Sequence, residues 1–299
     1  LDAVSVFEAT LEDPRQILRA QESRARGEAV AAMKADGIDY DERIELLEDV
    51  TYPRPLADLL GAAFAIYRQS HPWLSEDQLV PKSIVRDMWE RAMTFTEYVS
   101  FYGLVRSEGL VLRYLSDAYR TLRASVPDTA RTDALDDITE WLGALVRQVD
   151  SSLLDEWEQL TTADSPDAVV EVTAPVSLTQ NIRAFTVLVR NAMFRRVELA
   201  ALQRYDDLGA LDAAAGWTAD RWRDAIEDYH AEYDRLPTNA DARNPALLHV
   251  ERTPTKWLVR QVFDDPEGDH DWGIGASIDL AASDDAGEPV VAVIAVGPR

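Results

Sequence analysis

The sequence has no cysteine, only four histidines and very little lysine among its 299 residues. Without cysteine, the chain has no disulfide, no thiolate metal ligand and no cysteine nucleophile. No run reaches the roughly 18 consecutive apolar residues of a membrane-spanning helix, and no signal peptide opens the chain. We therefore expect a cytoplasmic protein that does not contact the membrane.

The motifs of several enzyme classes are missing as well. A phosphate-binding P-loop needs a Gly-Lys-Ser/Thr sequence, and none of the lysines, Lys34, Lys82 and Lys256, follows a glycine. The histidines lack the spacing of a zinc protease, and no Gly-x-Ser-x-Gly nucleophile motif occurs. We therefore expect no catalytic residue, no metal site and no cofactor in this chain.

Acidic residues greatly outnumber basic ones. The 30 Lys and Arg residues stand against 54 Asp and Glu residues, so the formal charge is 30 − 54 = −24. This overall charge argues against a stand-alone nucleic-acid-binding protein, because binding to phosphates needs a basic surface. Any contact with nucleic acid would depend on a local basic strip.

The hydrophobic pattern predicts a helical bundle over residues 1–163. Helical periods cover residues 13–37, 41–50, 56–69, 83–93, 94–102, 103–126 and 132–160. We expect Asp13 to cap the helix that begins at Pro14. On the helix at 56–69, one face is formed by Leu59, Leu60, Ala63 and Tyr67. Residues 164–179 contain two prolines and no helical period, so they predict a linker.

Residues 180–299 predict a small α+β domain, which makes the fold class of the whole chain α+β. Two helical patterns, at 182–208 and 218–233, precede strand patterns at 247–250, 256–263, 272–280 and 289–296. This order resembles the cone-shaped nuclear transport factor 2-like or polyketide-cyclase-like fold. If the sheet encloses a pocket, Tyr233, His249 and Trp257 would line it; the alternative, which we favour, is a filled core in which aromatic rings pack helix against sheet.

The most informative segment is residues 103–125, which carry a net charge of +2 within the acidic chain. Arg106, Arg113 and Arg120 recur every seven residues, and Arg123 is the fourth arginine of the segment. On a helix this spacing places them on one face, opposite an apolar stripe of Leu104, Val111, Leu115, Ala118 and Leu122. Such a row would bind the phosphates of a nucleic-acid backbone. The alternative is a solvated face with ion pairs to Asp117.

The same segment carries a family resemblance. The stretch SEGLVLRYLSDAYRTL resembles the ratchet helix of superkiller-like RNA helicases, in which a Glu-Gly dipeptide opens a helix with spaced arginines and a second helix pairs with it. A longer match covers nearly the whole chain and resembles the C-terminal region of unknown function in actinobacterial DEAD/DEAH-box helicases. It is carried by HPWLSEDQLVPKSIVRDMWERAMTF, RSEGLVLRYLSDAYRTLR, LVRQVDSSLLDEWE and DDPEGDHDWGIGASIDLAASD.

The resemblance implies a non-catalytic accessory region of an ATP-dependent helicase. Its partners would be a RecA-like helicase core in the same polypeptide, which would bind ATP and magnesium, and single-stranded RNA or DNA. Arg113 matches the arginine four residues after the Glu-Gly pair, whereas Asp117 stands where the superkiller-like helicases usually have a basic residue. Arg106 and Arg120 are assigned from helical spacing alone. Since the chain begins at Leu1 and not at Met, we expect a fragment of a longer protein.

Two further segments have alternative interpretations. A second basic helix carries Arg183, Arg190, Arg195, Arg196 and Arg204. These arginines would dock onto RNA or onto acidic surfaces of the first half or, as we favour, pair with carboxylates at 220–234. The acidic run at 264–271 would bind a cation or, as we favour, form a solvated turn. For the whole chain, the alternatives to a helicase accessory region are a small-molecule-binding or enzymatic cone-shaped domain on a helical scaffold, and a protein–protein adaptor.

Overall fold

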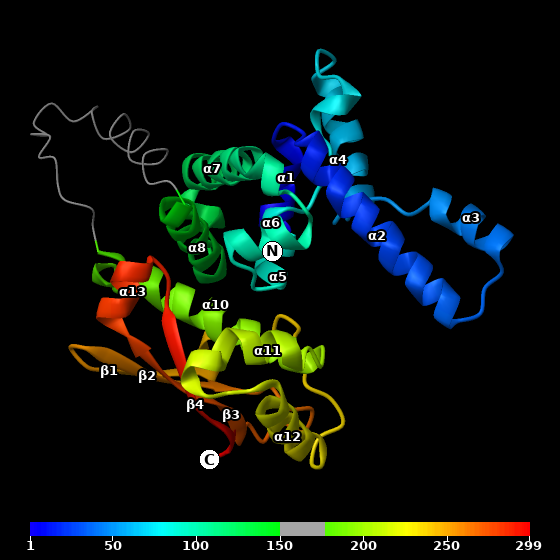
Figure 1. Ribbon diagram of the computed structural model, residues 1–299. Helices are drawn as coiled ribbons and strands as arrows, with labels where there is room; N and C mark the ends of the chain where they lie inside the picture. The colour runs from blue at the N-terminus through cyan, green and yellow to red at the C-terminus, as the bar shows by residue number, and fades with distance from the viewer. Residues whose placement is uncertain (150–176) are drawn as a thin grey trace, which may run out of the picture. The chain divides into compact units, whose positions relative to one another are not determined.

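The computed structural model describes residues 1–149 and 177–299, and the chain divides into two compact units, Leu1–Ser165 and Pro166–Arg299 (Figure 1). The first unit is helical, and the second combines helices with a four-stranded sheet, so the predicted α+β class is confirmed. Most of the predicted linker and the end of the helix predicted at 132–160 lie outside the described residues.

Within its described part, the first unit contains helices and no strand, as predicted. Short 3₁₀ helices occur at η1 (Glu76–Gln78), η2 (Val105–Ser107) and η3 (Asp128–Ala130). The α-helices are α1 (Asp2–Thr10), α2 (Arg15–Ala35), α3 (Tyr40–Glu48), α4 (Ala57–Ser70), α5 (Val85–Glu90), α6 (Phe95–Phe101), α7 (Glu108–Ser125) and α8 (Asp133–Val149). The sequence pattern did not predict α1.

The core of this unit lies where α7 and α8 pack together. Trp141 of α8 is buried and meets the Trp89 ring edge-on, with 5.0 Å between the centroids. Gly143 faces Tyr119 of α7 so closely that a Cβ at this position would lie 2.6 Å from the tyrosine ring. Glycine therefore sets the distance between the two helices. The pairing of a second helix with the arginine-bearing helix, which the resemblance implied, is present in this structure.

A buried carboxylate ties α1 to the start of α5. Glu8 is 1% exposed and accepts hydrogen bonds from the backbone N–H groups of Ile84, Val85 and Arg86 and from the hydroxyl of Tyr114. These donors include amides at the first turn of α5 that have no partner within their own helix. Burial raises the pKa of Glu8, although the same four hydrogen bonds oppose that shift.

The predicted cap at Asp13 is wrong. α2 begins at Arg15 with Pro14 as its N-cap residue, and no side chain caps it. Asp13 instead forms an ion pair with the ammonium group of Lys82, at 2.8 Å. Lys82 is fully buried, and a buried ammonium group without a charged partner is energetically costly. The Asp13 carboxylate therefore pairs with Lys82 and does not cap α2.

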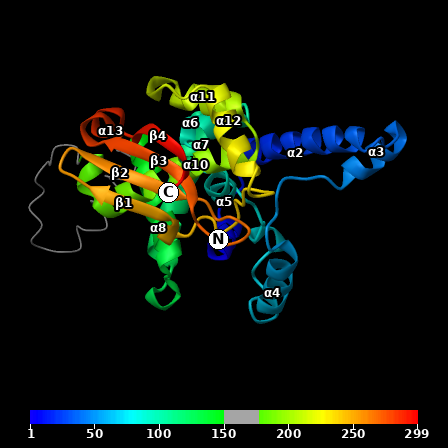
Figure 2. The same ribbon diagram turned by 90° about the horizontal axis from the view of Figure 1, so that it is seen from below.

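α3 and α4 extend away from the rest of the first unit, in different directions (Figures 1 and 2). α3 has no buried residue, and on α4 only Leu60 is buried. Leu59, Ala63 and Tyr67, which the helical period placed on one face with Leu60, are exposed. The period predicted the helix correctly, but of this face only Leu60 is buried.

From residue 177 on, where the description of the second unit begins, η4 (Leu178–Gln180) and three α-helices lead into an antiparallel sheet of order β1-β2-β3-β4. The other elements are α10 (Ile182–Ala201), α11 (Tyr205–Asp212), η5 (Ala213–Ala215), α12 (Ala219–His230), η6 (Pro245–Leu247), β1 (Leu248–Arg252), β2 (Lys256–Val262), β3 (Trp272–Asp279), α13 (Leu280–Ala286) and β4 (Val290–Pro298). All four predicted strands are confirmed to within a few residues.

One predicted helix of this unit is divided, and one helix was not predicted. The helix predicted at 182–208 is broken by Gln203, whose φ of 55° is left-handed, so α10 ends and α11 begins as a separate helix. Glycine is the usual residue at such a position, so the sequence contains no signal for the break. Between the strands predicted at 272–280 and 289–296 lies a helix that was not predicted, α13, which the Asp279 side chain caps and Gly287 terminates at φ 72°.

One face of the sheet forms the core of the second unit. Trp257, Val259 and Gln261, alternate residues of β2, are buried, and Phe185 of α10 meets the Trp257 ring with 4.8 Å between the centroids. The edge strand β4 is covered in its middle, because the Trp217 indole N–H donates to the Val293 carbonyl. This contact occupies a backbone acceptor that an open edge would offer to another strand.

Candidate nucleic-acid interface

α7 holds its arginines on a helix whose opposite side is fixed in the core. The predicted apolar stripe is buried, and Tyr114 of the same helix donates its hydroxyl hydrogen to Glu8 of α1. Glu108 lies in the first turn and Arg123 in the last, where each charge interacts favourably with the helix dipole. The outward face is therefore carried by a rigid element.

Three of the four predicted arginines are exposed, and two lie on one face of α7. The Arg113 side chain is 74% exposed, and that of Arg120, two turns further on, is 33% exposed. Arg123 is exposed and lies about 80° from this face at 100° per residue. Arg106 is exposed but lies in η2, because Ser107 has non-helical backbone angles and α7 begins only at Glu108. The prediction of one continuous helical row is therefore wrong at Arg106.

Asp117 lies between the two arginines on the outward face. Its carboxylate oxygens are 3.9 Å from Nε of Arg113 and 3.9 Å from Nη1 of Arg120. These distances exceed those of direct hydrogen bonds, and exposed pairs of this kind contribute at most about 1 kcal/mol. A phosphate could therefore replace Asp117 as the partner of Arg113 at little cost. The ion pairs of the alternative interpretation are present, but they are weak.

The C-terminal end of α7 gathers basic residues that the sequence pattern did not single out. Arg123 and Arg147 both approach the hydroxyl of Tyr119, at 3.0 and 3.5 Å. The Arg131 guanidinium donates to the Arg123 carbonyl at 2.9 Å and so satisfies one of the last carbonyls of the helix. Arg147 comes from α8 and Arg131 from the segment between the helices, and no spacing in the sequence predicts that they meet Arg123.

The second basic helix is used inside its own unit. Arg196 is buried and forms an ion pair with Asp212, in which Nε lies 3.1 Å from both carboxylate oxygens and Nη2 lies 2.6 Å from one of them. Arg195 is also buried, and its Nη1 lies 3.3 Å from a carboxylate oxygen of Glu198. Pairing within the unit was the favoured interpretation, but the carboxylates predicted at 220–234 are not the partner of Arg196. Asp212 ends α11 and lies outside residues 220–234, and the break at Gln203 folds α11 back toward α10.

The three predicted pocket residues are not brought together. His249 pairs with Arg260 across the sheet, so it lies on the face opposite Trp257, and its side chain is exposed. Trp257 packs against Phe185, as described above. Tyr233 lies elsewhere, with its hydroxyl 3.1 Å from a carboxylate oxygen of Asp271. Burial and that hydrogen bond raise the pKa of Tyr233. Strand alternation separates His249 from Trp257, so the pocket hypothesis is wrong.

The acidic run forms a turn organised by one of its own carboxylates. Asp265 is buried and accepts hydrogen bonds from the backbone N–H groups of Glu267, Asp269 and His270. Burial alone would raise the pKa of Asp265, but the N–H donors together outweigh it and hold the pKa below the usual 3.8. Among the residues that the structure describes, no group of three or more His, Asp or Glu side chains is placed to hold a metal ion.

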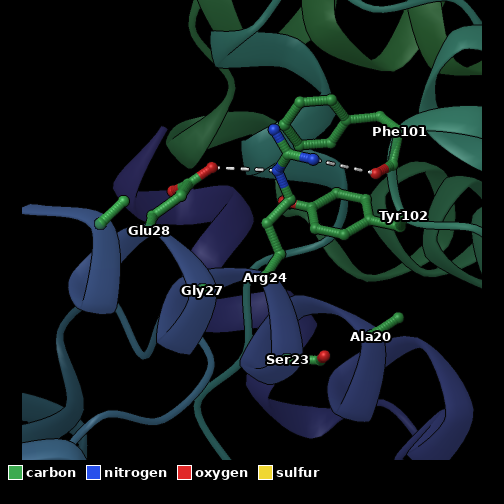
Figure 3. Close-up of a pocket in the computed structure, with 8 residues that line it drawn as sticks. Ala20, Ser23, Arg24, Gly27, Glu28, Phe101 and Tyr102 are labelled. Carbon is green, nitrogen blue, oxygen red and sulfur yellow. Dashed lines mark hydrogen bonds and ion pairs between the residues drawn. The ribbon is translucent and has the colours of Figure 1, made fainter.

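An open groove of about 480 Å³ lies between α2 and the end of α6 (Figure 3). The Arg24 guanidinium covers the Phe101 ring at 3.5 Å and donates to Glu28 at 3.0 Å. The Tyr102 hydroxyl donates to Asp87 at 2.6 Å. Because these polar groups are already engaged with neighbours, the groove offers weaker recognition chemistry than the outward face of α7.

Fold and site together define a two-unit α+β protein whose helical unit presents arginines on a fixed helix. A family model described as "Domain of unknown function (DUF3516)" matches residues 1–296, so the chain belongs to this family. Comparison with curated proteins and with solved structures gave no match. None of the helices in the described ranges is long and apolar enough to cross a bilayer.

Proposed function

We propose that this chain is the non-catalytic accessory region of an ATP-dependent RNA or DNA helicase. In this proposal, α7 contacts single-stranded nucleic acid beside a RecA-like motor that belongs to the same polypeptide. The motor binds ATP and magnesium, and this chain supplies no catalytic group. The resemblance of the α7 segment to a ratchet helix supports the proposal.

The observation that carries the proposal is the position of Arg113. It is the arginine that matches the ratchet-helix pattern, its side chain is 74% exposed, and its helix is anchored by a buried stripe. A guanidinium group forms paired hydrogen bonds with phosphate. Arg106, Arg120 and Arg123 extend the contact along the same segment.

The test is a fluorescence-anisotropy titration of the purified chain with a labelled single-stranded oligouridine at low salt. Arg113→Glu should weaken binding at least tenfold, because it removes one phosphate contact and adds a repulsive charge. Asp117→Asn should tighten binding, because it removes the carboxylate that competes with phosphate for Arg113 and Arg120.

Arg19→Glu provides the matched control. Arg19 is an exposed arginine on α2 of the same unit, so this variant has the same net charge as Arg113→Glu. Equal weakening by the two variants would show a response to overall charge only and would contradict a specific role for α7. Normal unwinding by the longer helicase after reversal of Arg106, Arg113 and Arg120 would also refute the proposal.

A further inference from the structure

The outward face of α4 is apolar and exposed from Leu59 to Ile66. Leu59 and Ile66 are 64% and 68% exposed, and Ala62 and Ala63 between them are also exposed. These four residues, spaced i, i+3, i+4 and i+7, lie on one side of the helix; we call them the α4 face. Contiguous exposed apolar surface of this kind marks a site of association.

The α4 face is symmetric about its own centre. Its two large side chains stand at the ends, and its two alanines flank the midpoint. When two such helices cross antiparallel about a two-fold axis, Leu59 of each copy meets Ile66 of the other. The alanines at the crossing point allow the helix axes to approach to about 8 Å. A surface that is complementary to itself in this way forms a closed dimer.

The charge distribution favours a second copy as the occupant. The chain carries −24, so two copies repel each other unless they meet on a surface that lacks this charge. α4 carries only Asp58 and Arg68, and Arg68 is turned to the other side, where it binds the Leu74 carbonyl and Glu76. α3, by contrast, carries four acids against one arginine, a net charge of 1 − 4 = −3.

We infer that two copies of this chain associate through the α4 face in an antiparallel dimer. A helix of 14 residues is about 21 Å long. With the flanking Tyr67 and Trp73, its exposed side offers on the order of 500 Å² per copy. A total of about 1,000 Å² lies at the lower limit of specific interfaces. We therefore expect a reversible dimer with a dissociation constant on the order of 10 μM.

Sedimentation equilibrium of the whole purified chain over a concentration series tests the dimer. Ile66→Glu should weaken association at least tenfold, because it would bury a carboxylate against an apolar surface. Ile44→Glu is the matched control, since Ile44 is 46% exposed on α3 and should not affect association. A wild-type chain that is monomeric throughout the series, or equal effects of the two variants, would overturn the inference.

Disulfide cross-linking tests the antiparallel geometry, because the chain contains no other cysteine. Ala63→Cys, next to the two-fold axis, should oxidise to a cross-linked dimer. Ser70→Cys should not, because 15 residues of helix rise, about 22 Å, separate the two copies of this position, whereas a disulfide requires Cα atoms within about 7 Å. Equal cross-linking at both positions would indicate parallel helices and overturn the inference. No cross-linking at Ala63→Cys would also overturn it and leave the α4 face to a different partner.

Discussion

The strongest stability prediction concerns Glu8, the buried carboxylate between α1 and α5. Glu8→Ala leaves three backbone N–H groups and the Tyr114 hydroxyl without their acceptor. At about 1 kcal/mol for each lost hydrogen bond, the free energy of unfolding of the first unit should fall by about 4 kcal/mol. This is a large fraction of the roughly 5–15 kcal/mol that stabilises a typical domain.

Glu8→Gln separates the hydrogen bonds from the charge. One oxygen of Glu8 accepts the bonds from Ile84, Val85 and Tyr114, and the amide oxygen of glutamine can take over that role. Only the bond from the Arg86 N–H to the other oxygen is lost, so the expected destabilisation is about 1 kcal/mol.

The assay is urea unfolding of the whole chain, with hydrogen exchange at the Ile84 and Val85 amides to report on the first unit. Asp284→Ala serves as the control, because its carboxylate binds Thr179 within the second unit. It should leave exchange at Ile84 and Val85 unchanged. If Glu8→Gln and Glu8→Ala lowered the free energy of unfolding equally, the number of retained hydrogen bonds would not determine the loss. A loss below about 1 kcal/mol in Glu8→Ala would show that the hydrogen bonds to Glu8 do not stabilise the first unit.

The pH dependence of the Glu8 contribution follows from the raised pKa. The folded state holds the proton more tightly than the unfolded chain, whose pKa is near the usual 4.5. The contribution is therefore fully present below about pH 4.5 and decreases as the pH rises through the folded-state pKa. The difference in the free energy of unfolding between the wild type and Glu8→Gln should decrease over the same pH range. A difference that grows with pH would contradict the raised pKa of Glu8.

Three further predictions concern other buried contacts. Asp212→Asn should destabilise the second unit by about 3 kcal/mol, because it leaves the buried Arg196 charge uncompensated, and calorimetry that finds no change would contradict this pairing. Gly143→Ala should lower the melting temperature of the first unit by several degrees, since its new methyl group overlaps the Tyr119 ring; an unchanged melting temperature would show that the helices can separate freely. Asp265, whose pKa is lowered, should stabilise the second unit above about pH 3.8 and lose this effect as the pH falls through its folded-state pKa. Asp265→Asn should abolish that dependence in acid unfolding curves, and a retained dependence would assign it to another group.

Local patterns predicted most of the elements, because each depends on residues close together in the sequence. The strand pattern at 256–263 and the apolar stripe of α7 are confirmed at the level of individual buried side chains. The helix break at Gln203 was missed, because a non-glycine residue takes a left-handed conformation there. Asp279 and Gly287 did signal α13, but the short segment between them has no apolar period.

Long-range contacts account for the remaining errors. Two ion pairs, Asp13–Lys82 and Arg196–Asp212, join segments that are separate in the sequence. They depend on where these segments meet in space. The pocket hypothesis, which was not the favoured one, grouped His249 with Trp257 although the strand pairing separates their faces, because the pairing register is not visible in either strand alone. The exposure of the apolar side of α4 was not predicted for a related reason. A helical period predicts that one face is apolar, but it does not identify which surface covers that face.

The central claim is that Arg113 contacts the backbone of a single strand. Its most direct test is the slope of log affinity for oligouridine against log salt concentration, measured for the wild type and for Arg113→Gln. Each phosphate contact on a single strand contributes about 0.7 to the magnitude of this slope. The account predicts a slope about 0.7 smaller in Arg113→Gln, whereas an unchanged slope would show that α7 does not bind the strand through this arginine.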